Sequence, residues 1–234
     1  MSQIAPEHLV DYSPIEAAVD NVSLPWQMTR MERMGFLHLL RAFKPKIALE
    51  VGTDKGGSLQ AIMQHASQAI SVDINTTNQT LLKKMPDFAN VEFIAGDSAA
   101  ILPELVQLIN SNKLPVNFVL IDGDHSTAGA QRDIEAIFSI VPQQPMCVVM
   151  HDSFMPQVRR AIMNVGWQAY PYVHYLEIDY VHGAFLPLDA AGHFKMVGGL
   201  AMAIMKPEPR FEQLEVYASH AYAFDALLSV AANR

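Results

Sequence analysis

The stretch IALEVGTDKGGS, residues 47–58, is the part of the sequence that decides the fold. Its first five residues form a short, mostly apolar run typical of a buried β-strand, and a glycine-rich turn leads from Val51 into a helix opened by Ser58. A strand, a glycine turn and a helix in this order form the first part of a βαβ unit. The stretch therefore predicts an α/β protein with a parallel sheet.

The same alternation continues along the chain. Short apolar runs predict further strands over residues 69–73, 91–94, 117–121 and 146–150, and amphipathic stretches predict helices over 58–67, 78–85, 98–111, 127–140 and 155–165. Runs such as 118–121 are continuously apolar, as expected for parallel strands buried on both faces. We therefore expect a Rossmann-like, doubly wound sheet with helices on both of its faces.

Two flanking segments complete the predicted organisation: a partly helical segment over residues 1–44 and a C-terminal segment over 207–234, on either side of a main domain over 45–206. Within the main domain, the stretches 167–180 and 199–205 predict a final antiparallel strand pair, with a lid loop of roughly twenty residues between them. A helix is predicted over 212–232, and its apolar stripe is expected to dock on the domain or on a second copy of the chain in a homodimer. The stripe comprises Leu214, Tyr217, Ala221, Phe224, Leu227 and Leu228.

The composition argues against several classes of protein. The 16 Lys and Arg residues against 24 Asp and Glu give the 234-residue chain a formal charge of −8, which disfavours a nucleic-acid partner. The densest basic stretch, from Arg30 to Lys46, is interrupted only by Glu32 and is predicted to be a solvated helix face. No segment is apolar enough to span a membrane, and the N-terminal residues lack a signal-peptide pattern. With Cys147 as its one cysteine, the protein is expected to be soluble and cytoplasmic, with a buried thiol.

Polar residues follow the first three predicted strands at the edge where open α/β sheets bind ligands. The turn after Val51 has glycines that let the backbone approach a ligand closely. Asp73 ends the second strand, where a carboxylate can accept the hydroxyls of a ribose, and Asp97 and Ser98 follow the third, where they could hold an adenine. Each of these positions has a structural alternative, because glycine is common in βα turns and Asp73, Asn75 or Asp97 could simply cap a helix. Together they favour a nucleoside site.

Two further strand ends carry both carboxylates and imidazoles. The segment Asp122-Gly123-Asp124-His125-Ser126 follows the fourth predicted strand, and His151-Asp152-Ser153 follows the fifth. This grouping favours metal or proton-transfer chemistry, with Asp122 and Asp152 sharing a hard divalent ion and His151 or Ser153 completing its shell. The alternatives are a turn that places the first group in water and a helix cap at Asp152.

Several common motifs are missing from the sequence. It contains no G-x-S-x-G elbow, no P-loop and no H-E-x-x-H, so the hydrolase and nucleotide-cleaving classes lose their main support. Gly52 and Gly56 are separated by three residues, which does not fit the G-x-G-x-x-G of dinucleotide sites. A dehydrogenase is therefore disfavoured.

Taken together, these segments resemble the class I S-adenosylmethionine-dependent methyltransferases, in particular the small-molecule O-methyltransferases grouped with the cephalosporin hydroxylase-like and macrocin O-methyltransferase-like proteins. The resemblance covers about residues 45–165 and is carried by Glu50-x-Gly52-x-x-x-Gly56-Gly57-Ser58, Asp73, Gly96-Asp97-Ser98, Asp122-Gly123-Asp124-His125-Ser126 and His151-Asp152. The sequence departs from many relatives in its Thr127-Ala128, and from the magnesium enzymes in having His151-Asp152-Ser153 in place of an acidic pair or Asp-Asn.

The resemblance implies a seven-stranded sheet of order 3-2-1-4-5-7-6 with an antiparallel last strand. It implies that S-adenosylmethionine binds with its methionine end on the first turn, its ribose on Asp73 and its adenine near Asp97 and Ser98. The expected cofactor-binding residues are Glu50, Gly52, Thr53, Gly56, Gly57, Ser58, Asp73, Asp97, Ser98 and Asp122. It also implies Mg²⁺ on Asp122 and Asp152, with His151 as a further candidate ligand, and His125 as general base.

We therefore expect methyl transfer from S-adenosylmethionine to a hydroxyl of a small molecule, assisted by Mg²⁺, with Asp122 and His125 as the catalytic residues. Two alternatives stay open. One is a metal-independent methyltransferase with His125 or His151 as the base, and the other is a non-catalytic protein that binds S-adenosylmethionine or a nucleoside.

Overall fold

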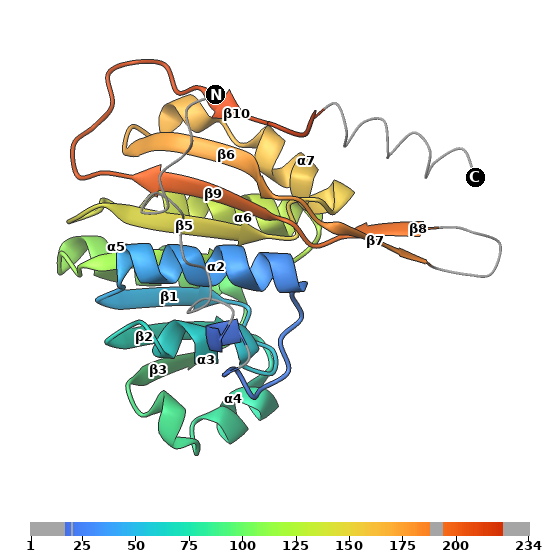
Figure 1. Cartoon of the computed structure of the whole chain (residues 1–234). Coiled ribbons are helices and arrows are strands. Elements are labelled where there is room, and N and C mark those ends of the chain that lie inside the picture. The colour runs from blue at the N-terminus through green and yellow to red at the C-terminus, as the bar shows by residue number, and fades with distance from the viewer. Residues whose placement is uncertain (1–16, 20, 188–193, 222–234) are drawn as a thin grey trace, which may run out of the picture.

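The computed structural model describes residues 17–19, 21–187 and 194–221. Eight strands form one sheet in the order β10-β6-β9-β5-β4-β1-β2-β3 (Figure 1). Their bounds are β1 (Ile47–Val51), β2 (Gln68–Asp73), β3 (Val91–Ala95), β4 (Val116–Ile121), β5 (Met146–His151), β6 (Val173–Val181), β9 (Leu200–Met205) and β10 (Val216–Tyr217). Two more strands, β7 (Ala184–Pro187) and β8 (Phe194–Val197), pair with each other in a hairpin that projects from the sheet (Figure 1).

The strand directions match the predicted topology. Strands β1 to β5 are parallel to one another, and β9 runs antiparallel to both β5 and β6. If β6 and β9 are counted as the sixth and seventh strands, the predicted order 3-2-1-4-5-7-6 is confirmed. The additional strand β10 pairs in parallel with β6 at the edge of the sheet.

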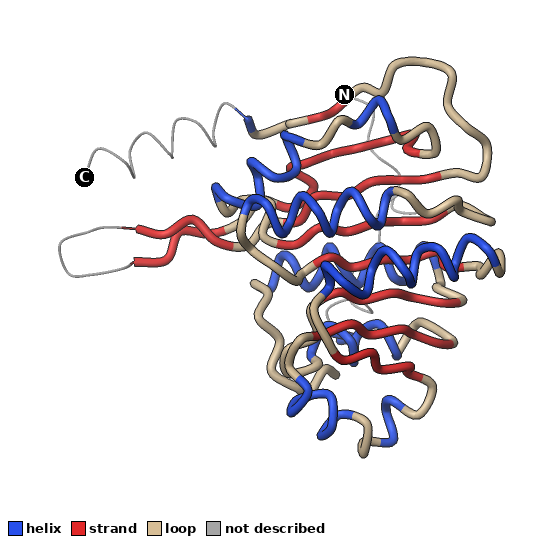
Figure 2. The backbone as a smooth tube through the Cα atoms, turned by 180° about the vertical axis from the view of Figure 1, so that it is seen from behind, coloured by secondary structure: helices blue, strands red, loops and turns tan. Residues whose placement is uncertain are grey.

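Helices cover both faces of the sheet, as predicted (Figures 1 and 2). On the face shown in Figure 1 lie α2 (Arg30–Phe43) and α3 (Gly57–Met63), and on the face shown in Figure 2 lie α5 (Ser98–Ser111), α6 (Thr127–Phe138) and α7 (Pro156–Asn164). The short helix α4 (Thr76–Leu82) follows β2, and two 3-10 turns span Pro86–Phe88 and Trp167–Ala169. Among the described residues, none of the helices combines the length and the apolar character that crossing a bilayer requires.

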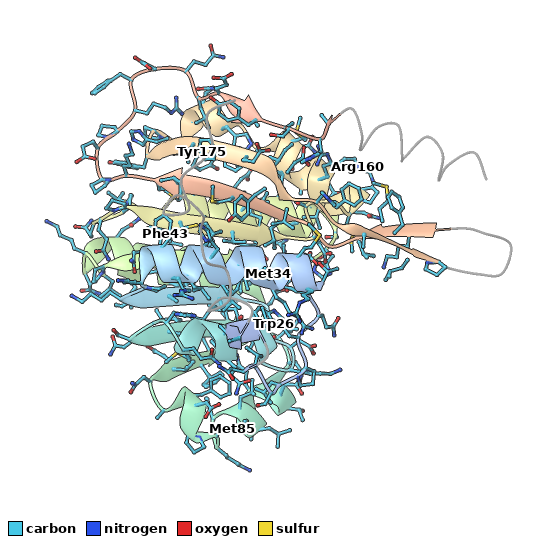
Figure 3. The ribbon with its side chains drawn as sticks, viewed as in Figure 1. Trp26, Met34, Phe43, Met85, Arg160 and Tyr175 are labelled. Carbon is cyan, nitrogen blue, oxygen red and sulfur yellow. The ribbon has the colours of Figure 1, made fainter. Side chains whose placement is uncertain are left out.

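Successive residues of the central strands bury on opposite faces, which explains their continuously apolar sequences. In β4, Phe118 and Leu120 pack with α2 and α3, whereas Val119 and Ile121 pack with α5, α6 and α7. The N-terminal segment labelled in Figure 3 extends the first of these clusters, because Trp26 packs edge-to-face on Phe36, with ring centroids 6.0 Å apart. Both faces of the central strands β4 and β5 are therefore buried.

Two predictions about the later part of the chain need correction. The lid loop predicted between β6 and β9 contains the β7–β8 hairpin, and its residues 188–193 lie outside the described part. The helix predicted over 212–232 does not begin before Ala221, and its residues 222–232, with Phe224, Leu227 and Leu228, lie outside that part too. The Gln168 side-chain amide donates to the carbonyl oxygen of Leu214 and accepts from its backbone N–H. Glu177 accepts from the backbone N–H of Ser219. These tertiary bonds replace the ones a helix would make within itself.

Candidate active site

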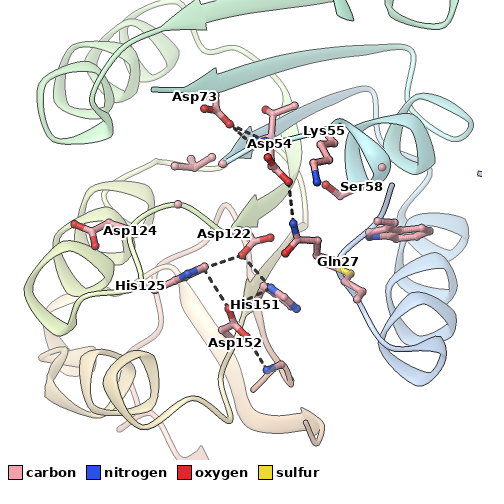
Figure 4. A pocket seen from close by; sticks show the side chains of 18 of the residues that line it. Gln27, Asp54, Lys55, Ser58, Asp73, Asp122, Asp124, His125, His151 and Asp152 are labelled. Carbon is pink, nitrogen blue, oxygen red and sulfur yellow. Dashed lines mark hydrogen bonds and ion pairs between the residues drawn. The ribbon is translucent and has the colours of Figure 1, made fainter. Parts of the chain in front are cut away.

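A pocket with a volume of about 1030 Å³ lies at the carboxyl ends of β1, β2, β4 and β5 (Figure 4). It brings together residues from all five predicted strand ends. The predicted site residues that line it are Gly52, Thr53, Gly57, Ser58, Asp73, Asp97, Ser98, Asp122, His125, His151 and Asp152. Glu50 and Gly56, which were also predicted, do not line it.

The glycine-rich turn is fixed to the neighbouring strand ends by its backbone. Gly52 has a φ of +88°, and a Cβ atom there would lie 2.0 Å from the carbonyl oxygen of Asp122, so only glycine fits. Asp73 Oδ2 accepts hydrogen bonds from the backbone N–H groups of Thr53 (2.6 Å) and Asp54 (2.8 Å). Asp73 therefore shapes the turn as well as lining the pocket, and Asn75, not Asp73, caps α4.

Glu50 lies fully buried beneath this turn. Its Oε1 accepts a hydrogen bond from the Ser58 hydroxyl (2.6 Å), and among the described residues its Oε2 has no partner. Burial raises the pKa of Glu50 to about 8, because the charged form loses its hydration, and the nearby carboxylates of Asp122 and Asp73 act in the same direction. Glu50 thus lies one hydrogen bond behind the pocket wall formed by Ser58.

The third strand end supplies a residue that is both a cap and a pocket residue. Asp97 accepts a hydrogen bond from the backbone N–H of Ala99 (2.9 Å) and so caps α5, yet it also lines the pocket. Ser98 lines the pocket too, and its hydroxyl donates to the buried carboxyl of Asp133 (2.9 Å). The capping role and a place in the pocket are therefore compatible.

The fourth and fifth strand ends form a cluster of carboxylates and imidazoles (Figure 4). Asp122 Oδ1 lies 2.9 Å from His151 Nδ1 and 3.2 Å from His125 Nε2. The same His125 nitrogen lies 3.2 Å from Asp152 Oδ2. Asp152 does not cap α7: its Oδ1 accepts from the backbone N–H of Gly198 (2.6 Å), and its backbone has a φ of +58°, which is strained for a non-glycine residue.

These contacts set the charges of the cluster. Burial alone would raise the pKa of Asp122, but the imidazoles of His151 and His125 hold it at about 2. The hydrogen bond to Asp122 raises the pKa of His125, and Asp152 adds to this effect. Burial opposes the charged form of His151, yet Asp122 and Glu32 raise its pKa well above the ordinary value. The neighbouring carboxylates thus raise the proton affinity of both imidazoles.

One wall of the pocket was not predicted from the sequence: the N-terminal segment 25–29, where the Gln27 amide donates to Asp54 Oδ2 (3.1 Å). A further wall is one face of the β7–β8 hairpin, which lies within the loop that was predicted to border the site.

Glu32, which also lines the pocket, is only 1% exposed. The sequence signal for it was the Thr29-x-x-Glu32 capping box, which marks a helix start but not a buried carboxylate. Arg30 and Arg41 of the same helix are exposed, as predicted, whereas Arg33 is half-buried and donates to the carbonyl oxygens of Met28 and Trp26.

Comparisons with known proteins agree with this architecture. Residues 49–153 match the family model described as a methyltransferase domain. The O-methyltransferase from Bacillus cereus in complex with SAH is similar in structure, with a TM-score of 0.54 and 16% identity over 85% of this chain and 93% of that one. No curated protein matches the sequence.

Two other solved structures with this fold are similar to the chain, one titled an O-methyltransferase and the other an N-methyltransferase. The O-methyltransferase TomG from Streptomyces achromogenes, in complex with SAM, has a TM-score of 0.53 and 17% identity over 86% of this chain and 93% of that one. The N-methyltransferase NodS from Bradyrhizobium japonicum has a TM-score of 0.50 and 13% identity over 84% of this chain and 98% of that one. At these identities the likeness shows the fold and not the acceptor. Residues 49–153 are therefore similar to a methyltransferase domain, and the sheet has the strand order that the resemblance implied.

Proposed function

We propose that this protein transfers a methyl group from S-adenosylmethionine to a hydroxyl group of a small molecule. The observation that carries the proposal is that one pocket is lined both by the glycine-rich turn, Asp73 and Asp97 and by the cluster of Asp122, His125 and Asp152. A methyltransferase needs this pairing of a nucleoside site with a group that removes a proton.

The residues around the turn fit the cofactor chemically. The turn from Gly52 to Ser58 would hold the methionine end, with the buried carboxyl of Glu50 behind Ser58 as a further polar group. Asp73 would accept from the ribose hydroxyls, because each carboxylate oxygen can accept more than one hydrogen bond. Asp97 and Ser98 would lie by the adenine.

His125 is the group placed to remove the acceptor's proton. Its side chain is 46% exposed, whereas that of His151 is 6% exposed, so His125 is the more accessible of the two imidazoles that line the pocket. Asp122 and Asp152 hold the His125 ring from one side and fix its orientation. S-adenosylmethionine supplies the methyl group as an electrophilic sulfonium. The protein therefore has to align the acceptor oxygen with it and take up the proton.

We further propose Asp122 and Asp152 as the residues that would hold a Mg²⁺ ion. Their carboxylates are hard ligands of the kind that Mg²⁺ prefers. His151 lies with them in a group of three candidate ligands, but both of its ring nitrogens already contact carboxylates, those of Asp122 and Glu32. Bound Mg²⁺ would lower the pKa of the acceptor hydroxyl.

A metal-independent reaction is the second candidate, and one observation favours it. His125 Nε2 lies 3.2 Å from an oxygen of both Asp122 and Asp152, so the imidazole already bridges the two carboxylates. Activity that EDTA abolishes and Mg²⁺ restores would support the metal, and activity that EDTA leaves unchanged would support the metal-independent reaction.

The experiment that tests the function uses S-adenosylmethionine with a labelled methyl group and a panel of phenols, catechols and glycosides. We expect label in at least one acceptor, with release of S-adenosylhomocysteine. Tight binding of S-adenosylhomocysteine without turnover of any acceptor would instead favour the non-catalytic binding protein. The homodimer and the cytoplasmic location stay predictions from the sequence.

A further inference from the structure

Glu32 is a buried carboxylate that the proposed chemistry does not use. It lies in the first turn of α2, is 1% exposed, and has contacts on both of its oxygens. Oε2 accepts from the backbone N–H of Thr29 (2.7 Å). Oε1 accepts from the backbone N–H of Gly199 (2.6 Å) and lies 3.2 Å from His151 Nε2.

Only one of these contacts belongs to the helix start. The capping box needs the bond between Oε2 and Thr29, and an exposed glutamate would make it equally well. The contacts of Oε1 reach residues 119 and 167 positions further along the chain. Burying a carboxylate is costly unless its partners compensate, so these long-range contacts account for the position of Glu32 inside the protein.

The partner Gly199 belongs to the base of the β7–β8 hairpin. Gly198 and Gly199 connect the end of β8 to the start of β9, and a Cβ atom on Gly198 would lie 2.7 Å from Glu32 Oε1. The N–H of Gly198 also donates to Asp152. The hairpin that rises from this base lines the pocket with Ala184, Leu186, Lys195 and Val197. Glu32 thus contacts both the hairpin base and the ring of His151.

We propose that Glu32 is a positioning residue for the active site. By holding His151 Nε2, it turns the other ring nitrogen toward Asp122, which in turn holds His125. By holding Gly199, it fixes the hairpin wall relative to the same cluster. The kinetic consequence rests on the proposed methyltransferase function, whereas the contact between Glu32 and His151 can be tested without turnover.

The first experiment is NMR of the protein labelled with ¹⁵N-histidine, comparing the wild type with Glu32→Gln. The amide keeps the size of the side chain but replaces one carboxylate oxygen by a hydrogen-bond donor. We expect the ring signals of His151 to shift and those of the exposed His38 to stay unchanged. The matched control is Leu39→Ala, which removes a buried side chain from the same helix without touching His151. Unchanged His151 signals in Glu32→Gln would overturn the proposal.

The second experiment measures kinetics with the acceptor that the panel identifies. A small misplacement of reacting groups can lower the rate about 100-fold, so we expect Glu32→Gln to lower kcat by about 10- to 100-fold. The dissociation constant of S-adenosylhomocysteine should change less than about twofold, because Glu32 touches none of the residues assigned to the cofactor. The control Leu39→Ala should lower stability but keep kcat within about threefold of the wild type.

A double-mutant cycle separates positioning from a general structural effect. If Glu32 acts through His151, Glu32→Gln should lower kcat less in a His151→Gln background than in the wild type, and what remains of the loss belongs to the contact with Gly199. An equal loss in both backgrounds, or wild-type kcat in folded Glu32→Gln, would overturn the proposal. Glu32→Asp, which keeps the charge but shortens the reach, provides a second variant with the same expected loss if Glu32→Gln does not fold. A wild type that methylates no acceptor would refute the function, while the NMR comparison would still decide the contact.

Discussion

At the scale of single residues, carboxylates and imidazoles alternate in one continuous series. The order is Glu32, His151, Asp122, His125 and Asp152, with 2.9 to 3.2 Å between neighbouring atoms. Each imidazole lies between two carboxylates, so every carboxylate of the series has an imidazole as a hydrogen-bonding partner, which makes its burial tolerable. The series begins at the buried Glu32 and includes His125, the more exposed of the two imidazoles.

This more exposed imidazole leads to the first prediction. His125→Ala should lower kcat by about 100-fold or more, because general base catalysis contributes factors of this size, and should leave the affinity for S-adenosylhomocysteine unchanged. Steady-state kinetics and calorimetry on the same preparation measure the two effects. His38→Ala, at an exposed position on α2, is the control. Wild-type turnover in His125→Ala would remove this residue from the mechanism.

Glu50 provides the second prediction, on stability and pH. The pKa of Glu50 is about 8 in the folded protein, against 4.5 for an ordinary glutamate. As the pH rises through this range the unfolded chain loses the proton first, so the wild type loses stability. Glu50→Gln lacks the titrating group and should not lose this stability. The difference in the free energy of unfolding, variant minus wild type, should therefore be roughly 2–4 kcal/mol more positive at pH 8 than at pH 5.

Denaturant unfolding at several pH values measures this difference. Glu92→Gln, at an exposed position on β3, is the control and should follow the wild type at every pH. A difference between Glu50→Gln and the wild type that stays constant from pH 5 to pH 8 would show that Glu50 titrates normally.

At the scale of elements, the β7–β8 hairpin has two distinct faces. Side chains alternate along its strands, and Leu186 pairs with Lys195 on the face that lines the pocket. On the other face, Phe185 and Met196 pack against Phe154, with the two phenylalanine rings 5.7 Å apart. The packed face fixes the hairpin on the domain, and the pocket face forms a wall on the side of the cluster, where the acceptor is expected.

This arrangement gives the third prediction. Leu186→Asp should raise the KM for the acceptor by about tenfold, because it puts a negative charge and less apolar surface on that wall, while the affinity for S-adenosylhomocysteine stays the same. Leu186 is 52% exposed, so the protein should remain folded. Met163→Asp, at a similarly exposed apolar position on α7, is the control. A loss of affinity for S-adenosylhomocysteine with an unchanged KM for the acceptor would show that the hairpin borders the cofactor and not the acceptor.

The elements also show what sequence patterns can and cannot predict. The first five strands were predicted to within one or two residues, and α5 from end to end, because apolar runs and caps are local signals. The segment after Pro209 was predicted to be a helix because its apolar spacing fits one. Its backbone instead bonds to Gln168, Glu177 and Asp179, which come from distant parts of the chain. No local pattern reveals such partners.

At the scale of the whole molecule, the pocket lies where the parallel strands end, and most of its polar residues follow apolar runs in the sequence. That is why Asp73, Asp97, Asp122 and Asp152 were found without a structure. Glu32 and the N-terminal wall were not found, because their places depend on how α2 packs across β4 and β5. The residues at the strand ends can be predicted from short stretches of sequence. The remaining walls of the pocket depend on how distant segments pack in the complete fold.

Binding of the methyl donor in this pocket is the step on which the proposed function rests. Calorimetry with S-adenosylhomocysteine, in the presence and absence of Mg²⁺, measures this binding. We predict saturable binding at one site per chain, and binding weakened by about tenfold or more in Asp73→Ala, because Asp73 holds the turn and is the residue proposed to accept from the ribose. Absence of saturable heat in the folded wild type, or the same affinity in Asp73→Ala, would contradict the assignment of the pocket.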